Sequence, residues 1–165
     1  MREMTNNGLL LCRMQAELFA NFSSIGKYSP YVFIRRFMNS NLVLRFDHLV
    51  ILGEISSNSV LIDELDKEYG PTDFGNPQVV DKEILYWVGY IYRYWAYVYD
   101  IPSCDMYKYV KPKLLIDRYY LYHSMDPQYA IERIIEEEKI QIIPHKTIDK
   151  LFEEYFEYLS NKDKY

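Results

Sequence analysis

The most regular pattern of apolar and polar positions lies in the middle of the chain, between residues 80 and 100. Apolar and aromatic side chains recur there at intervals of three and four residues, which predicts an amphipathic helix. The predicted inner face comprises Ile84, Trp87, Tyr90, Ile91, Tyr94, Trp95 and Val98, and the opposite face comprises Lys82, Tyr86, Gly89, Arg93, Ala96 and Asp100. We expect a largely buried, central aromatic helix whose phenol groups hydrogen-bond within the core or stack on a partner.

Helix signals recur along most of the rest of the chain. Residues 3–22 repeat apolar side chains on one helical face. Further helices are predicted at 30–37, 41–46, 60–69, 104–110, 112–122, 127–138 and 148–159. Their predicted N-caps, where the sequence offers one, are Ser29, Ser40, Ser59, Ser103, Asp126 and Thr147.

Three stretches do not fit this regular pattern. The apolar run at 49–52 is compatible with helix or strand, and we favour helix. Residues 70–79 contain two glycines and two prolines and form a predicted loop, which separates an N-terminal half from a tyrosine-rich half. Residues 140–144 are predicted to form an extended connector or an edge strand before the peripheral C-terminal helix.

These elements predict an all-α fold with at most one short strand. A chain of 165 residues is long enough to bury a full core and is most simply one helical domain, spanning 1–165. The hydrophobic content of 49% excludes a disordered chain. The longest apolar runs are too short for a membrane span or a signal peptide, so we expect a soluble, cytoplasmic protein with no membrane partner.

The net charge of −5 is unevenly distributed. Residues 1–46 carry a net +4, residues 47–83 a net −7, residues 84–125 a net +2 and residues 126–165 a net −4. The densest acidic group comprises Asp63, Glu64, Asp66 and Glu68. Such a group either forms an ordinary solvated helix face or attracts a basic patch on a partner protein.

Residue types that carry enzyme chemistry are sparse. Cys12 and Cys104 form no Cys-x-x-Cys pair, and the three histidines lack the spacing of metal ligands. The six glycines form no phosphate-binding loop. Cys104, His123 and Asp126 would make a thiol triad only if the fold brought them together. We therefore predict no enzyme, no catalytic residues, no metal and no cofactor.

Arg93 is the most informative charged residue of the aromatic helix. Gly89 and Ala96 lie one turn away on either side and leave space for another backbone or for an acidic group. An internal ion pair, with Asp100, Asp117 or the acidic loop as partner, is one interpretation. The other is a contact surface for a partner protein, formed by Tyr86, Arg93 and Tyr97 together with the acidic group at 63–68.

A basic segment follows the aromatic helix. Residues 99–113 combine a helix end, a short turn, a second helix start and lysines interleaved with tyrosines, which resembles a helix-turn-helix element within 93–122. The side chains that would contact operator DNA are Lys108, Lys111, Lys113 and Arg118. The sequence pI of about 5.2 argues against nucleic acid, because DNA-binding domains are usually basic.

Several motifs together resemble a known family. They are the segments 29–31, 35–40, 69–70, 87–95, 119–126 and 130–134, within a match from about Ser29 to Glu138. They are similar to small, uncharacterised, antitoxin-like cytoplasmic proteins of Firmicutes and gut bacteria, whose genes often lie beside one for an ADP-ribosyltransferase-like toxin. The resemblance implies an antitoxin or immunity role and supplies no catalytic residues. We therefore expect a protein-binding module that neutralises a cognate toxin, with a DNA-binding regulator as the alternative.

Overall fold

The computed structural model describes residues 1–25, 28–72 and 79–143, and these residues form an all-α protein. The elements are α1 (Asn6–Ile25), α2 (Pro30–Met38), α3 (Asn41–Asp47), the 3-10 helix η1 (Val50–Gly53), α4 (Asn58–Tyr69), α5 (Lys82–Tyr99), α6 (Ser103–Tyr109), α7 (Pro112–Tyr122) and α8 (Pro127–Glu138). No strand occurs in the described ranges, so residues 140–143 of the segment predicted at 140–144 do not form an edge strand, and residue 144 lies outside the described residues. The predicted helix at 148–159 and most of the predicted loop at 70–79 lie outside the described residues.

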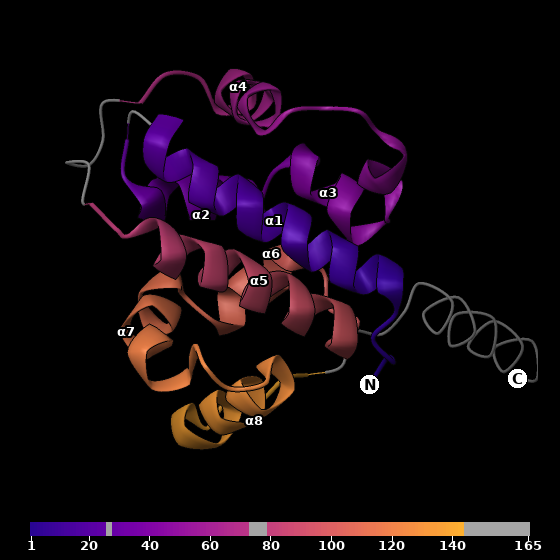
Figure 1. The fold of residues 1–165 in the computed structure, drawn as a ribbon, viewed down its shortest axis with the longest axis vertical. Coiled ribbons are helices and arrows are strands. Elements are labelled where there is room, and N and C mark those ends of the chain that lie inside the picture. The colour runs from indigo at the N-terminus through magenta and orange to yellow at the C-terminus, as the bar shows by residue number, and fades with distance from the viewer. Residues whose placement is uncertain (26–27, 73–78, 144–165) are drawn as a thin grey trace, which may run out of the picture.

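An antiparallel pair of helices, α1 and α5, occupies the centre of the molecule (Figure 1). Gly8 of α1 lies against the ring of Tyr97 near one end of the pair, and Gly89 of α5 lies against Ala16 near the middle. A Cβ atom at Gly89 would be 2.9 Å from the carbonyl oxygen of Gln15 and 3.0 Å from the Cα of Ala16. The absence of a side chain at Gly89 therefore lets the two backbones approach directly.

The other helices cover this pair from two sides. α4 packs on α1 and α2 at one end of the molecule, whereas α6, α7 and α8 pack on α5 and bring α7 and α8 to the opposite end (Figure 1). α2 and α3 link the two sides through contacts with α6. As a result α5 has neighbours on nearly every face.

Burial of α5 is more complete than the sequence pattern indicated. The predicted inner face is buried, including both tryptophans, apart from the half-buried ring of Tyr90. Gly89, Arg93 and Ala96 were expected on the outer face and are buried as well. The reason is that α1 and the segment around α6 cover that face, which a single helix pattern cannot predict.

A second aromatic centre, which the sequence analysis did not predict, is built from phenylalanines. Its members are Phe19 and Phe22 of α1, Phe33 and Phe37 of α2, and Phe46 of α3. Phe22 and Phe33 stack with ring centroids 4.0 Å apart, and Phe19 and Phe37 meet edge to face at 5.2 Å. Such pairs add to the apolar area that they bury, so this cluster holds α2 and α3 on α1.

Most predicted helix starts are confirmed. The side chains of Ser29, Ser40 and Asp126 accept hydrogen bonds from backbone N–H groups at the starts of α2, α3 and α8. Two predicted caps are wrong. Ser57, not Ser59, caps α4, and Ser103 is already inside α6, because its hydroxyl is engaged elsewhere in the core.

Candidate functional site

The best-defined polar site is a buried hydrogen-bonded cluster around Arg93. The Arg93 side chain is only 2% exposed and donates from Nε to Gln15 Oε1 at 2.9 Å. Its two terminal nitrogens donate to Asp47 Oδ1 at 2.6 Å and to Ser103 Oγ at 2.7 Å. Gln15 in turn donates to the carbonyl of Gly89 at 3.2 Å. Elements that are far apart in sequence, α1, α3, α5 and α6, therefore meet at one guanidinium group.

Asp47 is the acidic member of this cluster. It ends α3 and accepts from the Ser103 hydroxyl at 2.6 Å and from the Ser103 backbone N–H at 3.0 Å. Its carboxylate therefore caps the first turn of α6, where negative charge is favourable. The expected internal ion pair of Arg93 is confirmed, but its partner is Asp47 of α3, which was not among the expected partners. Asp100 and Asp117 are not the partners, since Asp100 is exposed at the C-cap of α5 and Asp117 pairs with Lys113.

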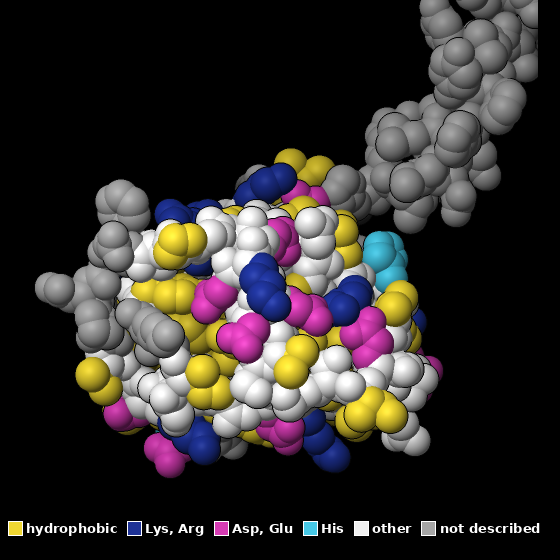
Figure 2. Space-filling view, turned by 90° about the horizontal axis from the view of Figure 1, so that it is seen from above, with side chains coloured by type: hydrophobic (Ala, Val, Ile, Leu, Met, Phe, Trp, Pro, Cys, Tyr) yellow, Lys and Arg dark blue, Asp and Glu magenta, His cyan; other side chains and the backbone are white. Residues whose placement is uncertain are grey.

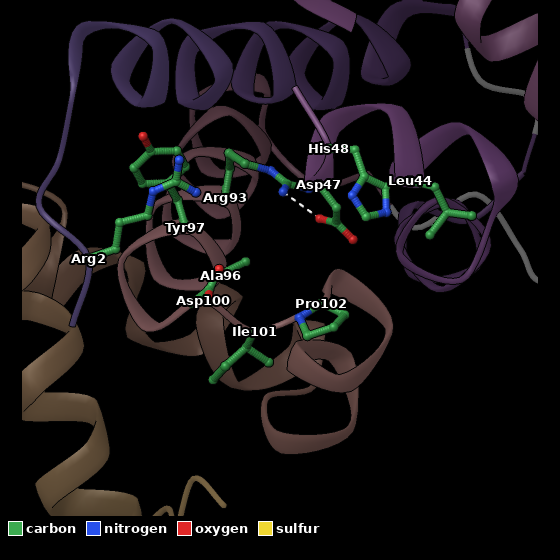
Figure 3. A pocket seen from close by; sticks show the side chains of 10 residues that line it. All are labelled: Arg2, Leu44, Asp47, His48, Arg93, Ala96, Tyr97, Asp100, Ile101 and Pro102. Atoms are coloured by element: carbon green, nitrogen blue, oxygen red, sulfur yellow. Dashed lines mark hydrogen bonds and ion pairs between the residues drawn. The ribbon is translucent and has the colours of Figure 1, made fainter. Parts of the chain in front are cut away.

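A pocket of about 280 Å³ opens beside this cluster (Figure 3). Arg93 and Asp47 form part of its wall, and Figure 3 shows the ion pair between them, with His48 and Pro102 on the α3 and α6 sides. At the other side, Arg2 lies over the ring of Tyr97 at 4.1 Å. The charges of the lining nearly balance, and the Arg93 nitrogens already have internal acceptors. The cluster therefore acts chemically as a tertiary anchor.

Two members of the predicted contact surface are consequently in the interior. Arg93 is buried, and Tyr97 is 6% exposed with its hydroxyl 2.7 Å from the Thr5 hydroxyl. Tyr86 is 36% exposed and remains available on the surface of α5. The prediction of an exposed surface formed by Tyr86, Arg93 and Tyr97 together is wrong, because α1 and the N-terminal residues cover the last two.

The acidic group on α4 is mostly engaged within the fold. Asp66 accepts from the Tyr28 hydroxyl at 2.6 Å, and Glu68 accepts from the backbone N–H of Asn41 at 2.9 Å, at the start of α3. Glu64 pairs with Arg45, which also pairs with Glu54 at 3.1 Å. Asp63 is exposed and lines a hollow beside Tyr28.

On the face that carries α4, the described acidic side chains therefore do not form a continuous acidic surface. Figure 2 shows acidic and basic side chains interspersed with apolar ones there. Burial and the neighbouring Asp66 raise the pKa of Tyr28. The contacts of Asp66, Glu64 and Glu68 tie α4 to α2 and α3, so these residues have a structural role whatever else they bind.

The predicted DNA-contacting residues lie on α6, on α7 and at their junction. Lys108 pairs with Asp105 at 2.6 Å, and Lys113 pairs with Asp117 at 2.7 Å. Lys111 lies 4.0 Å from the centroid of the Tyr107 ring. Arg118 pairs with Glu138 and, at 3.8 Å, with Glu137 of α8. These contacts lower the positive charge available to phosphates, and DNA binding stays a prediction.

Among the residues that the structure describes, Cys104, His123 and Asp126 do not form the thiol triad that the sequence left open. Asp126 caps α8 through Gln128, and His123 stacks on Tyr119 with ring centroids 4.6 Å apart, so neither is joined to Cys104 as the thiol triad required. Burial raises the pKa of Cys12 to about 12, which keeps that thiol protonated and unreactive. Across 1–25, 28–72 and 79–143, no three His, Cys, Asp or Glu side chains group as metal ligands.

An exposed aromatic corner, formed by α7, α8 and the turn between them, was missed by the sequence analysis. Large apolar side chains face solvent there within ten positions, with Tyr120 at 72% and Tyr129 at 66% exposure. Leu121 and Met125 are also exposed. The signal in the sequence was that these residues fall outside the buried pattern of their helices, whose inner positions are Leu115, Tyr122, Ala130, Ile131 and Ile134.

A hollow of about 540 Å³ lies along α8 at this corner. Met125 and Tyr129 supply its apolar lining, and its polar lining is Asp126, Glu132, Arg133 and Glu136. Burial is the main cause that raises the pKa of Tyr94 and of Tyr99, and the charge of Glu132 adds to it at both rings. The negative charges of Asp126 and Glu132 therefore act on the Tyr94 ring, and that of Glu132 on the Tyr99 ring as well.

No protein-family model, curated protein or solved structure matches this chain. Within the part of the chain that the structure describes, none of the helices has both the length and the apolar content needed to cross a bilayer.

Proposed function

We propose that this chain is a non-enzymatic protein-binding module, the antitoxin component that neutralises a cognate toxin by forming a direct complex. The observation that carries the proposal is the aromatic corner of Tyr120, Leu121, Met125 and Tyr129. Exposed apolar patches of this kind mark interaction surfaces, and tyrosines are enriched at the centres of protein interfaces. The resemblance to antitoxin-like proteins supplies the class of partner.

The core of the molecule supports the same conclusion. The strongest polar cluster, around Arg93, has its donors directed at internal acceptors, and Cys12 is protonated and buried. The Arg93 cluster and the Cys12 thiol therefore belong to the interior that holds the fold together. Binding by a rigid helical surface is a function that requires no further chemistry, because a blocking partner acts by covering its target.

The test is co-expression with the ADP-ribosyltransferase-like protein whose gene, as the resemblance implies, lies beside the gene for this chain. That protein should stop growth when it is expressed alone, and this chain should restore growth and co-purify with it in fixed stoichiometry. A specific complex should bury about 1,200–2,000 Å² in total. Rescue by this chain at a small fraction of the toxin level, or rescue without any complex, would contradict inhibition by occupancy.

A matched pair of variants locates the surface. Tyr120→Ser with Tyr129→Ser should abolish rescue, because the two rings are the largest exposed apolar side chains of the corner. Val60→Ser with Ile55→Ser removes exposed apolar side chains from α4 and the loop before it and should leave rescue unchanged. Equal behaviour of both pairs would remove the aromatic corner as the contact surface.

A further inference from the structure

The hollow along α8 combines two properties that constrain what can occupy it. Its apolar lining, Met125 and Tyr129, is exposed, and its polar lining holds three carboxylates and one guanidinium group. Arg133 lies 3.6 Å from Glu136, so the positive charge of the lining is already matched by a carboxylate of the same helix. Asp126 and Glu132 leave a net negative charge beside the Tyr129 ring.

The last turn of α8 adds no further net charge. Glu137 and Glu138 pair with Arg118 of α7, Glu137 also accepts from the Tyr122 hydroxyl, and Lys139 ends the helix. The negative charge at the hollow therefore belongs to Asp126 and Glu132. Glu132 accepts from the Gln128 side chain at 3.0 Å, a neutral donor that leaves its charge uncompensated. An acidic surface around an exposed ring favours a ligand that carries both a cation and an aliphatic stem.

We propose that this α8 hollow binds a Lys- or Arg-bearing segment of the partner protein, an inference that rests on the proposed protein-binding function. The aliphatic stem of the basic side chain packs on Met125 and Tyr129. Its charged head then lies between Glu132 and Asp126, within reach of the negative field of α8. Complementary charge of this kind increases the association rate and selects against acidic partners.

Other occupants fit the surface less well. A second copy of this chain, docked through the same corner in a two-fold dimer, would bring two acidic α8 helices together and is opposed by like charge. Nucleic acid and anionic membranes present phosphates, which the same carboxylates repel. A basic polypeptide segment is the occupant that satisfies both the apolar and the charged part of the lining.

The test uses the full chain and three labelled synthetic peptides of equal length, built from Lys and Leu, from Glu and Leu, or from Lys and Ser. Fluorescence anisotropy should show the tightest binding for the Lys–Leu peptide, weaker binding for Lys–Ser, and none for Glu–Leu. Glu132→Lys should weaken the Lys–Leu complex by about tenfold. Asp63→Lys makes the same change in net charge on α4 and should change it less than about twofold.

The outcomes separate this inference from the proposed function. Equal weakening by Glu132→Lys and Asp63→Lys, or equal binding of the Glu–Leu peptide, would overturn the assignment of the α8 hollow. If the toxin co-purified equally with the wild type and with Glu132→Lys, the protein-binding function would stand and this inference would fail. If the Lys–Leu peptide bound at α8 while no toxin co-purified, the inference would stand and the proposed function would fail.

Discussion

At the scale of single residues, the guanidinium group of one buried arginine has hydrogen-bond acceptors within the fold for all three of its nitrogens. Arg93 joins four helices through Gln15, Asp47 and Ser103. A buried cation that has lost its counterion is far more unfavourable than an unpaired cation in water. The Arg93–Asp47 ion pair therefore constrains the tertiary arrangement more than it adds net stability.

Removing the acidic partner should therefore be strongly destabilising. Asp47→Ala leaves the Arg93 guanidinium without its counterion and the first turn of α6 without its cap, and should lower the free energy of unfolding by about 3–5 kcal/mol. Urea denaturation, followed by circular dichroism, measures the free energy of unfolding of the wild type and of the variant. The exposed pair Lys113–Asp117 provides the control, since Asp117→Ala should change little. Equal effects of the two substitutions would contradict the anchoring role of Asp47.

The buried hydroxyl of Tyr92 predicts a loss of stability at alkaline pH. It donates to the carbonyl of Val110 at 2.7 Å, and burial raises the pKa of Tyr92 well above its ordinary value of 10.0. Above about pH 10 the unfolded chain loses this proton while the folded chain keeps it, so stability falls as the pH rises. Tyr92→Phe should cost about 1 kcal/mol near pH 7 and should show a flatter decline in alkali.

Denaturation midpoints measured between pH 7 and 11 test this expectation. Tyr120→Phe changes an exposed ring and should follow the wild-type curve. Parallel alkaline declines for wild type and Tyr92→Phe would show that Tyr92 does not contribute to the pH dependence.

At the scale of elements, the contact between α1 and α5 organises the rest. Both helices are long enough to bury a continuous face, and the small residues at their contact bring the backbones together. α5 then presents its remaining faces to α6, α7 and α8. The close contact at Gly89 is therefore the most sensitive point of the pair.

Gly89→Ala should separate α1 from α5. The added Cβ would meet two backbone positions at 2.9 and 3.0 Å, which cannot move without shifting the whole helix. We expect a loss of about 1–3 kcal/mol from overpacking, although alanine is intrinsically the better helix former. Gly53→Ala is the matched control, because a Cβ there meets nothing within 4 Å. Thermal unfolding that is unchanged for both variants would contradict the close contact.

At the scale of the whole molecule, the two cysteines report on how the fold opens. Cys12 of α1 is fully buried, and burial raises its pKa to about 12, which keeps it a thiol, whereas Cys104 is partly exposed. A thiol reagent at pH 8 should modify Cys104 quickly and Cys12 only through opening of the central helix pair. In Cys104→Ser the fast phase should vanish. Two fast thiols in the native wild type would show that the centre is accessible.

The surfaces at the two ends of the molecule have different roles. The acids of α4 hold α2 and α3, so replacing all of Asp63, Glu64, Asp66 and Glu68 would perturb the fold as well as any association rate. Helices α7 and α8, which carry the aromatic corner, lie at the end of the molecule opposite α4 (Figure 1). The exposed side chains of this corner are less involved in holding the fold than the acids of α4. A partner can thus cover α8 without disturbing the central pair.

The sequence by itself determined the all-α class, most helix boundaries and the burial of the aromatic helix. These features depend on local periodicity, capping residues and proline, all of which act within one helical turn. The starts of α2, α3 and α8 followed from Ser29, Ser40 and Asp126 for that reason. The internal pairing of Arg93 was also indicated by the small residues around it.

Only the tertiary structure decided which charged side chains are paired within the fold and which aromatic rings stay exposed. Asp47 is 46 positions from Arg93, and Ser103 bonds a carboxylate from another helix, so no local rule could pair them. The exposure of Tyr120 and Tyr129, and the burial of Tyr97, depend on which helix covers each face. Packing between elements that are distant in sequence decides which helix covers which face. The hydrophobic effect that drives this packing depends on buried area and leaves no pattern in the local sequence.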